Sequence, residues 1–183
     1  MENPENRALV TLDPRSFKAV LEATYILVRL EPYFETFGKR QIKSPKLYFA
    51  DTGLACYLLG IDTVEQLTKD SLYGSLFENW VVIELMKARY NQGLEPRLYF
   101  YRDTLGKEVD LLFQRGSKLI PIEIKSGKTF SSSFLDGLHY FHEQAPSKAE
   151  GGVLIYSGQQ TQQVGKYHLF NAENCSTFML GIN

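Results

Sequence analysis

Cysteines, long apolar runs and an excess of charge of either sign are all scarce in this chain of 183 residues. Cys56 and Cys175 are its two cysteines, and a structural disulfide is not expected because Cys56 falls in a predicted buried helix. No apolar run approaches the roughly 18 residues of a membrane-spanning helix. Residues 1–7 lack the basic and apolar regions of a secretory signal. We therefore expect a cytoplasmic protein with no membrane partner.

The formal net charge of −1 argues against a protein that coats nucleic acid through charge alone. Local basic patches are still open. Two clusters are candidates, namely Lys39, Arg40, Lys43 and Lys46, and then Arg115, Lys118, Lys125 and Lys128. Each is either a solvated surface or a site of phosphate contact. The second cluster flanks the carboxylates described below, which favours phosphate contact there.

Two other short motifs, a partial P-loop and a histidine pair, lack a residue that their usual binding sites require. The Gly-Lys-Thr sequence at 127–129 resembles part of a phosphate-binding P-loop, but that motif needs a glycine five positions earlier, where Ile122 stands. We therefore expect no bound nucleotide. His139 and His142 lie three residues apart on a predicted helix with no third His or Cys nearby in the sequence. A solvated helix face is favoured over a metal site for this pair.

The first 50 residues predict a helix followed by a two-stranded hairpin. Apolar residues recur at helical spacing over 16–24, and residues 26–30 and 47–49 have the composition of short strands. Two interpretations are open for this segment. It is either the recognition helix and wing of a partial winged helix, or an extension that packs on the main domain.

Residues 51–70 predict a helical linker. Asp51 can cap a short helix that Gly60 ends, since Asp accepts hydrogen bonds from the first turn and Gly adopts the left-handed conformation at a helix end. Asp62 or Thr63 can cap a second short helix in the same way.

Residues 71–183 predict a mixed α/β domain. Gly106 and Gly116 lie in the turns between three strand-like runs, which is typical of an antiparallel meander. A later apolar run, flanked by glycines and placed after a helix, is typical of a buried parallel strand. The pattern thus predicts helices at 75–90 and 130–143, meander strands at 97–102, 108–114 and 118–125, a parallel strand at 151–156, and an edge strand at 167–170.

The sequence places two acids and a lysine at neighbouring positions in this predicted sheet. Side chains alternate between the faces of a strand, so Glu123 and Lys125 share a face opposite Ile124. Asp110 lies on the preceding strand. Two carboxylates and a lysine on one sheet face predict a divalent-metal site with a cation beside it.

The order of these residues resembles the PD-(D/E)XK nuclease superfamily, in which a helix acid precedes an Asp on one strand and Glu-x-Lys on the next. Glu78 is the corresponding helix acid. Residues 43–54 and 74–79 also look like the C-terminal half of a prokaryotic family of AAA-type ATPases, whose ATPase module precedes a winged-helix segment and a nuclease-like domain. The resemblance covers residues 16–171 and implies a restriction-endonuclease-like α-β-β-β-α-β core with a mixed sheet. The ATPase module has no counterpart in this sequence.

The nuclease resemblance also implies roles for individual residues. Asp110, Glu123 and the backbone carbonyl of Ile124 would bind Mg²⁺ or Mn²⁺, and Glu78 would add a ligand directly or through water. Lys125 would orient the attacking water and balance charge on the transition state. The implied reaction is hydrolysis of phosphodiesters, and the implied partner is DNA.

Each of these residues also has a structural interpretation. Residues 75–78 match a capping box, with Ser75 at the N-cap and Glu78 three residues later. Asp110 and Lys125 could form an ion pair that remains from an inactive site. Glu108 shares the predicted face of Asp110 and is either an extra ligand or an exposed charge at a strand end.

Two functions therefore stay open, a metal-dependent nuclease and a non-catalytic module that binds DNA or a protein. The first 50 residues add a third expectation, because an uncovered apolar face of this size is typical of an interface. We expect self-association through Phe17, Leu21, Tyr25, Tyr33 and Phe34.

Overall fold

A computed structural model describes residues 13–34 and 44–181. None of the helices in these two stretches is long and apolar enough to cross a membrane. The elements in chain order are α1 (Pro14–Ala23), β1 (Leu27–Leu30), β2 (Lys46–Phe49), α2 (Thr52–Leu58), α3 (Val64–Lys69), α4 (Tyr73–Tyr90), β3 (Leu98–Arg102), β4 (Glu108–Arg115), β5 (Lys118–Lys125), η1 (Ser132–Leu135), α5 (Asp136–Gln144), β6 (Val153–Tyr156), β7 (Gln162–Val164), β8 (Tyr167–Asn171), η2 (Ala172–Asn174) and α6 (Cys175–Leu180).

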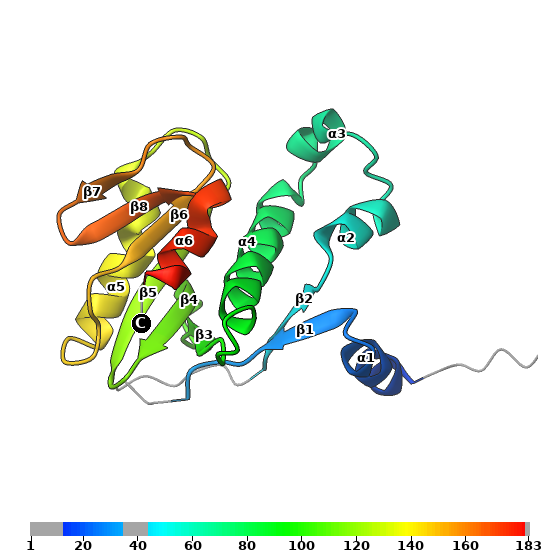
Figure 1. Ribbon diagram of the computed structural model, residues 1–183, viewed down its shortest axis with the longest axis horizontal. Coiled ribbons are helices and arrows are strands. Elements are labelled where there is room, and N and C mark those ends of the chain that lie inside the picture. Colours follow the sequence, from blue (N-terminus) through cyan, green and yellow to red (C-terminus); the bar gives the residue numbers. More distant parts are fainter. Residues whose placement is uncertain (1–12, 35–43, 182–183) are drawn as a thin grey trace, which may run out of the picture.

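The main body is a six-stranded mixed sheet in the order β3-β4-β5-β6-β8-β7. Strands β3, β4 and β5 form the predicted antiparallel meander, and β6 pairs in parallel with β5 after the chain crosses through α5. Helices α4 and α6 cover one face of the sheet, and α5 covers the other (Figure 1). A mixed α/β architecture is therefore confirmed.

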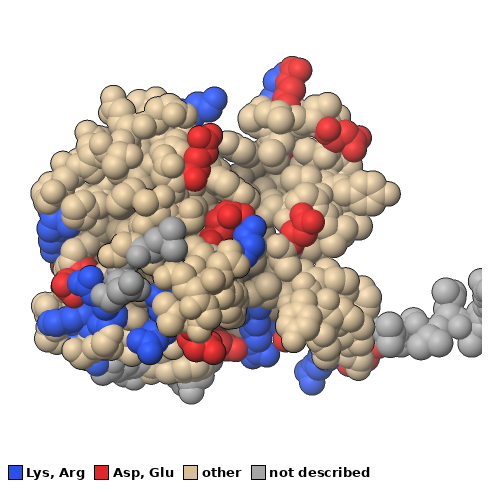
Figure 2. Space-filling model, viewed as in Figure 1, with Lys and Arg blue, Asp and Glu red and all other residues tan. Residues whose placement is uncertain are grey.

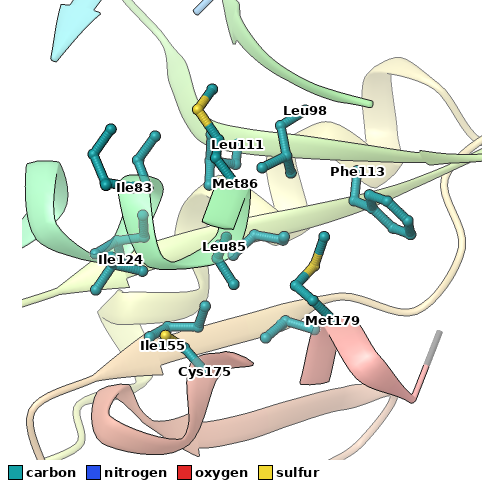
Figure 3. Packing of buried hydrophobic residues seen from close by; sticks show 14 of the residues in the cluster. Ile83, Leu85, Met86, Leu98, Leu111, Phe113, Ile124, Ile155, Cys175 and Met179 are labelled. Carbon is teal, nitrogen blue, oxygen red and sulfur yellow. The ribbon is translucent and has the colours of Figure 1, made fainter. Parts of the chain in front are cut away.

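The largest core cluster lies between the sheet and the helices α4 and α6. Helix α4 is buried through most of its length, and its Leu85 contacts strand residues such as Leu111 and Ile155 in this cluster. Cys175 and Met179 of α6 belong to the same cluster, beside the residues of α4 (Figure 3). Apolar residues thus fix the strand ends against α4, the helix that carries Glu78.

The hairpin β1–β2 packs on this body and also forms a two-stranded sheet of its own. Leu30 and Tyr48 belong to the main core cluster. The chain after β1 runs along the edge strand β3, where Phe100 donates its N–H to the carbonyl of Glu31 and accepts from the N–H of Tyr33. The predicted helix and hairpin of the N-terminal segment are confirmed, apart from residues 1–12 and 35–43, which lie outside the described residues.

The short helices of the linker have the expected caps. The Asp51 carboxylate accepts hydrogen bonds from Gly53 and Leu54. At the next helix the cap is Thr63, which forms a capping box with Gln66. The sequence left Asp62 and Thr63 as alternatives, and the structure selects Thr63.

Three details differ from the sequence predictions. The strand at 167–170 is not an edge strand, because β8 lies between β6 and β7, and the polar sequence Gln162–Val164 gave no apolar signal for β7. The capping box at Ser75 is wrong, since α4 begins at Tyr73 with Leu72 at its N-cap. The predicted helix at 130–143 begins as the 3₁₀ turn η1 and becomes α-helical at Asp136.

Candidate functional site

A β-bulge in β4 determines where Asp110 points. Between β3 and β4, Tyr99 pairs with Leu112 and Tyr101 pairs with Val109, so β4 carries one extra residue over this interval. Val109 consequently packs in the cluster under α5, whereas Leu111 packs under α4. A bulge re-aims a side chain and interrupts regular pairing. Here it frees the Asp110 carboxylate to accept a hydrogen bond from the Ile124 N–H at 2.8 Å.

Lys125 joins the two carboxylates. Its ammonium nitrogen lies 2.5 Å from Glu123 Oε2 and 3.4 Å from Asp110 Oδ2. Glu123 is almost fully buried, and the Asp110 side chain is 16% exposed. The structure therefore brings Asp110, Glu123 and Lys125 together at the end of β5, with the lysine as the most exposed of the three side chains.

Burial and mutual repulsion set the protonation of this group. Burial, and after it the neighbouring Asp110 charge, together raise the pKa of the Glu123 carboxyl to about 8. Burial also raises the pKa of Asp110, against the opposing effect of Lys125. For Lys125, burial alone would lower the pKa, but the two carboxylates outweigh it and raise the pKa above its usual value. The acid pair thus holds a proton near neutral pH that a divalent cation would replace.

Glu123 has an unsatisfied buried oxygen. Its Oε1 atom is buried and has no hydrogen-bond partner among the described residues. Gly137 of α5 leaves space for this oxygen of Glu123, since a Cβ on residue 137 would lie 2.0 Å from Oε1. A buried carboxylate oxygen without a partner is costly unless a proton or cation binds there. Two hard oxygen donors with an open lone pair therefore fit Mg²⁺ or Mn²⁺.

The backbone of Ile124 is oriented suitably for its implied role. The N–H and C=O of one strand residue point toward the same neighbouring strand. Because the Ile124 N–H reaches Asp110, its carbonyl also faces β4. The candidate metal ligands of this chain are accordingly Asp110, Glu123 and the carbonyl of Ile124.

Glu78 occupies a separate position beside this group. Its Oε1 atom accepts hydrogen bonds from Lys46 Nζ at 2.8 Å and from the Tyr48 hydroxyl at 2.6 Å. Its charge is close enough to raise the pKa of Asp110. Within residues 13–34 and 44–181, no three His, Cys, Asp or Glu side chains gather tightly enough to hold one metal ion. Glu78 therefore fits a ligand that acts through water better than a direct ligand.

Glu108 lies at the start of β4 but is not the exposed charge that the sequence offered as one alternative. It is half-buried and forms ion pairs with Lys46 of β2 and Arg102 of β3. The sequence did not predict that Lys46 and Tyr48 contact Glu78. Both belong to the hairpin β1–β2, which is separated from α4 in the chain by α2 and α3. Their place in residues 43–54, the run that resembles the AAA-type ATPase family, was the available signal.

The second basic cluster of the sequence does not form a single patch, and most of the first lies outside the described residues. Lys39, Arg40 and Lys43 lie outside the described residues, whereas Lys46 is in the site. Arg115 and Lys118 lie at the opposite end of β5 from Lys125, and Arg115 pairs there with Glu150. Figure 2 shows acidic and basic side chains interspersed on one face of the molecule.

An apolar cavity of about 450 Å³ lies elsewhere, between the sheet and α6. Its lining includes Ile120 and Val153, near the starts of β5 and β6, and Phe178 of α6. The lining also includes Arg115, Glu150 and His168 but no pair of carboxylates, so we place the candidate site at Asp110 and Glu123 instead.

The raised pKa of Glu123 predicts a pH-dependent stability. In the unfolded chain this carboxyl loses its proton near its ordinary pKa of 4.5, whereas the folded protein keeps it up to about 8. The unfolded state then binds fewer protons between these values, so the free energy of unfolding falls as pH rises from 5 to 8, by at most about 1.4 kcal/mol per pH unit for one proton. Chemical denaturation of the parent and Glu123→Gln across this range measures it. A stability difference between the two proteins that does not change with pH would contradict the assignment.

The chain is similar to two families of unknown function and to two mycobacterial proteins. Residues 73–175 match the model of a domain of unknown function, DUF4143, and residues 14–65 match a second, DUF8612. The uncharacterized proteins Rv2008c of Mycobacterium tuberculosis and Mb2031c of Mycobacterium bovis are each 34% identical to the chain over 120 residues, which is 65% of this chain. The chain spans about a quarter (26%) of the length of these relatives.

Proposed function

We propose a metal-dependent phosphodiesterase function for this chain, which belongs to the DUF4143 family. The observation that carries the proposal is the buried Asp110–Glu123 pair, with an unpartnered Glu123 oxygen and a lysine contacting both acids. Buried acid pairs destabilise a fold unless something compensates them. The carboxylate oxygens of Asp110 and Glu123, one of which has no partner, are the kind of donors that a divalent cation binds.

The site residues have two proposed roles, binding the metal and contacting the phosphate or the water. Asp110, Glu123 and the Ile124 carbonyl would hold Mg²⁺ or Mn²⁺, which when bound supplies an activated water and neutralises phosphate charge. Lys125, anchored by both carboxylates, presents its ammonium to a phosphate oxygen or to the attacking water. The α4-β3-β4-β5-α5-β6 order supports a PD-(D/E)XK nuclease-like topology, and DNA is the proposed substrate.

Replacing Lys125 by alanine tests the catalytic half of the proposal. The change removes a positive charge beside the acids, so Mn²⁺ affinity should stay equal or rise, while cleavage falls by roughly 100-fold, the usual scale for one electrostatic stabiliser. Titration calorimetry with Mn²⁺ and cleavage of plasmid and single-stranded DNA give the two readouts. Lys69→Met, at an exposed ion pair on α3, is the control. Equal cleavage by parent and variant would remove Lys125 from the mechanism.

A second candidate function is a non-catalytic DNA- or protein-binding module. The observation that favours it is the ion pairing of Lys125 with both acids, which can satisfy the charges without a metal. An inactive site closed in this way should bind no Mn²⁺. A protein that binds Mn²⁺ but cleaves no form of DNA or RNA would support metal binding and reject the nuclease function.

We also propose that the chain self-associates through the N-terminal segment. Phe17, Tyr25 and Phe34 are at least half exposed, whereas Leu21 is half-buried and Tyr33 packs against Tyr99. Removing such apolar surface from water stabilises an interface. Light scattering at micromolar concentration should therefore give a mass above that of one chain. A mass of one chain across the concentration series would rule the interface out.

A further inference from the structure

The hairpin β1–β2 delivers a second lysine to the site. Lys46 Nζ lies 2.8 Å from Glu78 Oε1 and also contacts Glu108 Oε1. Its side chain is 17% exposed and lies over the Phe100 ring, with the nitrogen 5.6 Å from the ring centroid. Burial alone would lower the pKa of Lys46, but Glu78 and Glu108 outweigh it, so the side chain carries a full charge.

The same hairpin also fixes Glu78. Tyr48 is 6% exposed, and its hydroxyl donates to the Glu78 oxygen that Lys46 contacts. Burial and the nearby Glu78 charge raise the pKa of Tyr48, so the hydroxyl keeps its proton and remains a donor. Two donors from one strand thus hold one oxygen of Glu78 and leave Glu78 Oε2 as the atom that could turn toward Asp110.

The charges around the site are close to balance without a metal. Three cationic side chains contact four carboxylates, namely Lys46, Arg102 and Lys125 against Glu78, Glu108, Asp110 and Glu123. With all of them ionised the group carries one negative charge. A divalent cation would change this to one positive charge, which a phosphodiester would then neutralise. Without Lys46 the loaded site would be neutral and would attract a phosphate less strongly.

We propose that the hairpin supplies the site with its second substrate-facing cation. Lys46 neutralises Glu78 and Glu108 in the metal-free protein, and it contacts a substrate phosphate once Glu78 turns toward a divalent cation. Tyr48 is a positioning residue that holds Glu78 during this exchange. The inference rests on the proposed phosphodiesterase function. It makes the site a composite of β2 and the sheet rather than a property of the sheet alone.

The lysine is suited to such an exchange. An ammonium on a flexible four-carbon stem is a point charge that can change partners. The Lys46 ammonium also lies over the Phe100 ring, so its position does not depend on Glu78 alone. Arg102 remains on Glu108 and can keep that carboxylate neutralised when Lys46 leaves.

The first test is Mn²⁺ binding by titration calorimetry to the parent, Lys46→Met and Lys46→Arg. Lys46→Met keeps an unbranched apolar side chain of similar length and removes the cation that competes for Glu78, so Mn²⁺ should bind roughly tenfold more tightly. Lys46→Arg should return to the parent affinity. Lys69→Met, the same change in an exposed ion pair, should not alter it. Unchanged or weaker Mn²⁺ binding by Lys46→Met would overturn the inference.

The second test is binding of a fluorescent single-stranded oligonucleotide in Ca²⁺, measured by anisotropy at several salt concentrations. A lost phosphate contact lowers the slope of log K against log salt by about 0.7 for a single strand. Lys46→Met should show this loss, and Lys46→Arg should not. Tyr48→Phe should weaken Mn²⁺ binding but leave the salt slope intact. An unchanged slope for Lys46→Met would reject the phosphate contact, whatever its effect on stability.

These outcomes separate the inference from the proposed function. If the variants behave as expected but the parent cleaves no nucleic acid, the Lys46 assignment stands and the nuclease function fails. If Lys46→Met binds Mn²⁺ and the parent does not, Lys46 is confirmed as the internal counter-ion. If none of these proteins binds Mn²⁺, both proposals are overturned together.

Discussion

Asp110→Asn is expected to remove both divalent-cation binding and cleavage. The amide keeps nearly the same shape and its oxygen can still accept the Ile124 N–H, so the local backbone should persist. What disappears is one of two ionised oxygen donors for a hard cation. Losing even a group that only supports a ligand costs about 10- to 100-fold in metal affinity, so losing a ligand should cost at least roughly 100-fold.

The measurement is Mn²⁺ titration together with cleavage of plasmid DNA. Asp62→Asn, the same change at an exposed position before α3, is the matched control. The Asp110→Asn protein should also show a lower pKa for Glu123, because the repulsion from Asp110 is gone. Cleavage at the parent rate by Asp110→Asn would show that the activity comes from elsewhere, and the site assignment would then be wrong.

Much of this site follows from local rules that the sequence exposes. The turn glycines at 106 and 116 mark the meander, and alternation along β5 places Glu123 and Lys125 on the face opposite Ile124. Because adjacent strands of a meander pair directly, Asp110 was expected near Glu123. The structure brings Lys125 into contact with both acids.

The parts that could not be predicted depend on irregular or long-range geometry. Simple alternation put Glu108 and Asp110 on one face with the same surroundings, but the bulge in β4 directs Asp110 to Lys125 while Glu108 meets Lys46 and Arg102. No periodicity signals a single extra residue in a strand. The position of Lys46 in the site likewise depends on tertiary packing, since it requires the hairpin to pack beside α4 and β3.

Weak local signals explain the remaining differences. Strand β7 is three residues long and polar, so it lacks the alternation that marks a half-buried strand. Helix α6 is only six residues long, which is too short to show a helical pattern. Its Cys175 and Met179 are buried because they pack against the sheet. Glu78 matched the spacing of a capping box, yet tertiary contacts with Lys46 and Tyr48 determine where its side chain lies.

A small residue beside Glu123 is the least obvious requirement of the site. Gly137 lies in the first turn of α5, and a Cβ there would be 2.0 Å from Glu123 Oε1 and 2.7 Å from Glu123 Cδ. Real Cβ atoms do not approach other atoms so closely, so the carboxylate would have to move. Its backbone φ is not positive, and the helix itself would therefore accept alanine.

Gly137→Ala is accordingly expected to abolish tight Mn²⁺ binding without changing any charged residue. Displacing Glu123 removes one of the two carboxylate ligands, so affinity and cleavage should each fall by roughly 100-fold. Gly74→Ala in α4 is the matched control, because its Cβ would meet only Ser126 Oγ at 3.7 Å. Both changes raise helix propensity by about 1 kcal/mol, so a difference between them reports on the contacts of the Gly137 Cβ, which are with Glu123 and, at 3.3 Å, with the Glu108 carbonyl. Parent-like Mn²⁺ affinity in Gly137→Ala would mean that Glu123 is not a ligand, and the metal site would have to be sought elsewhere.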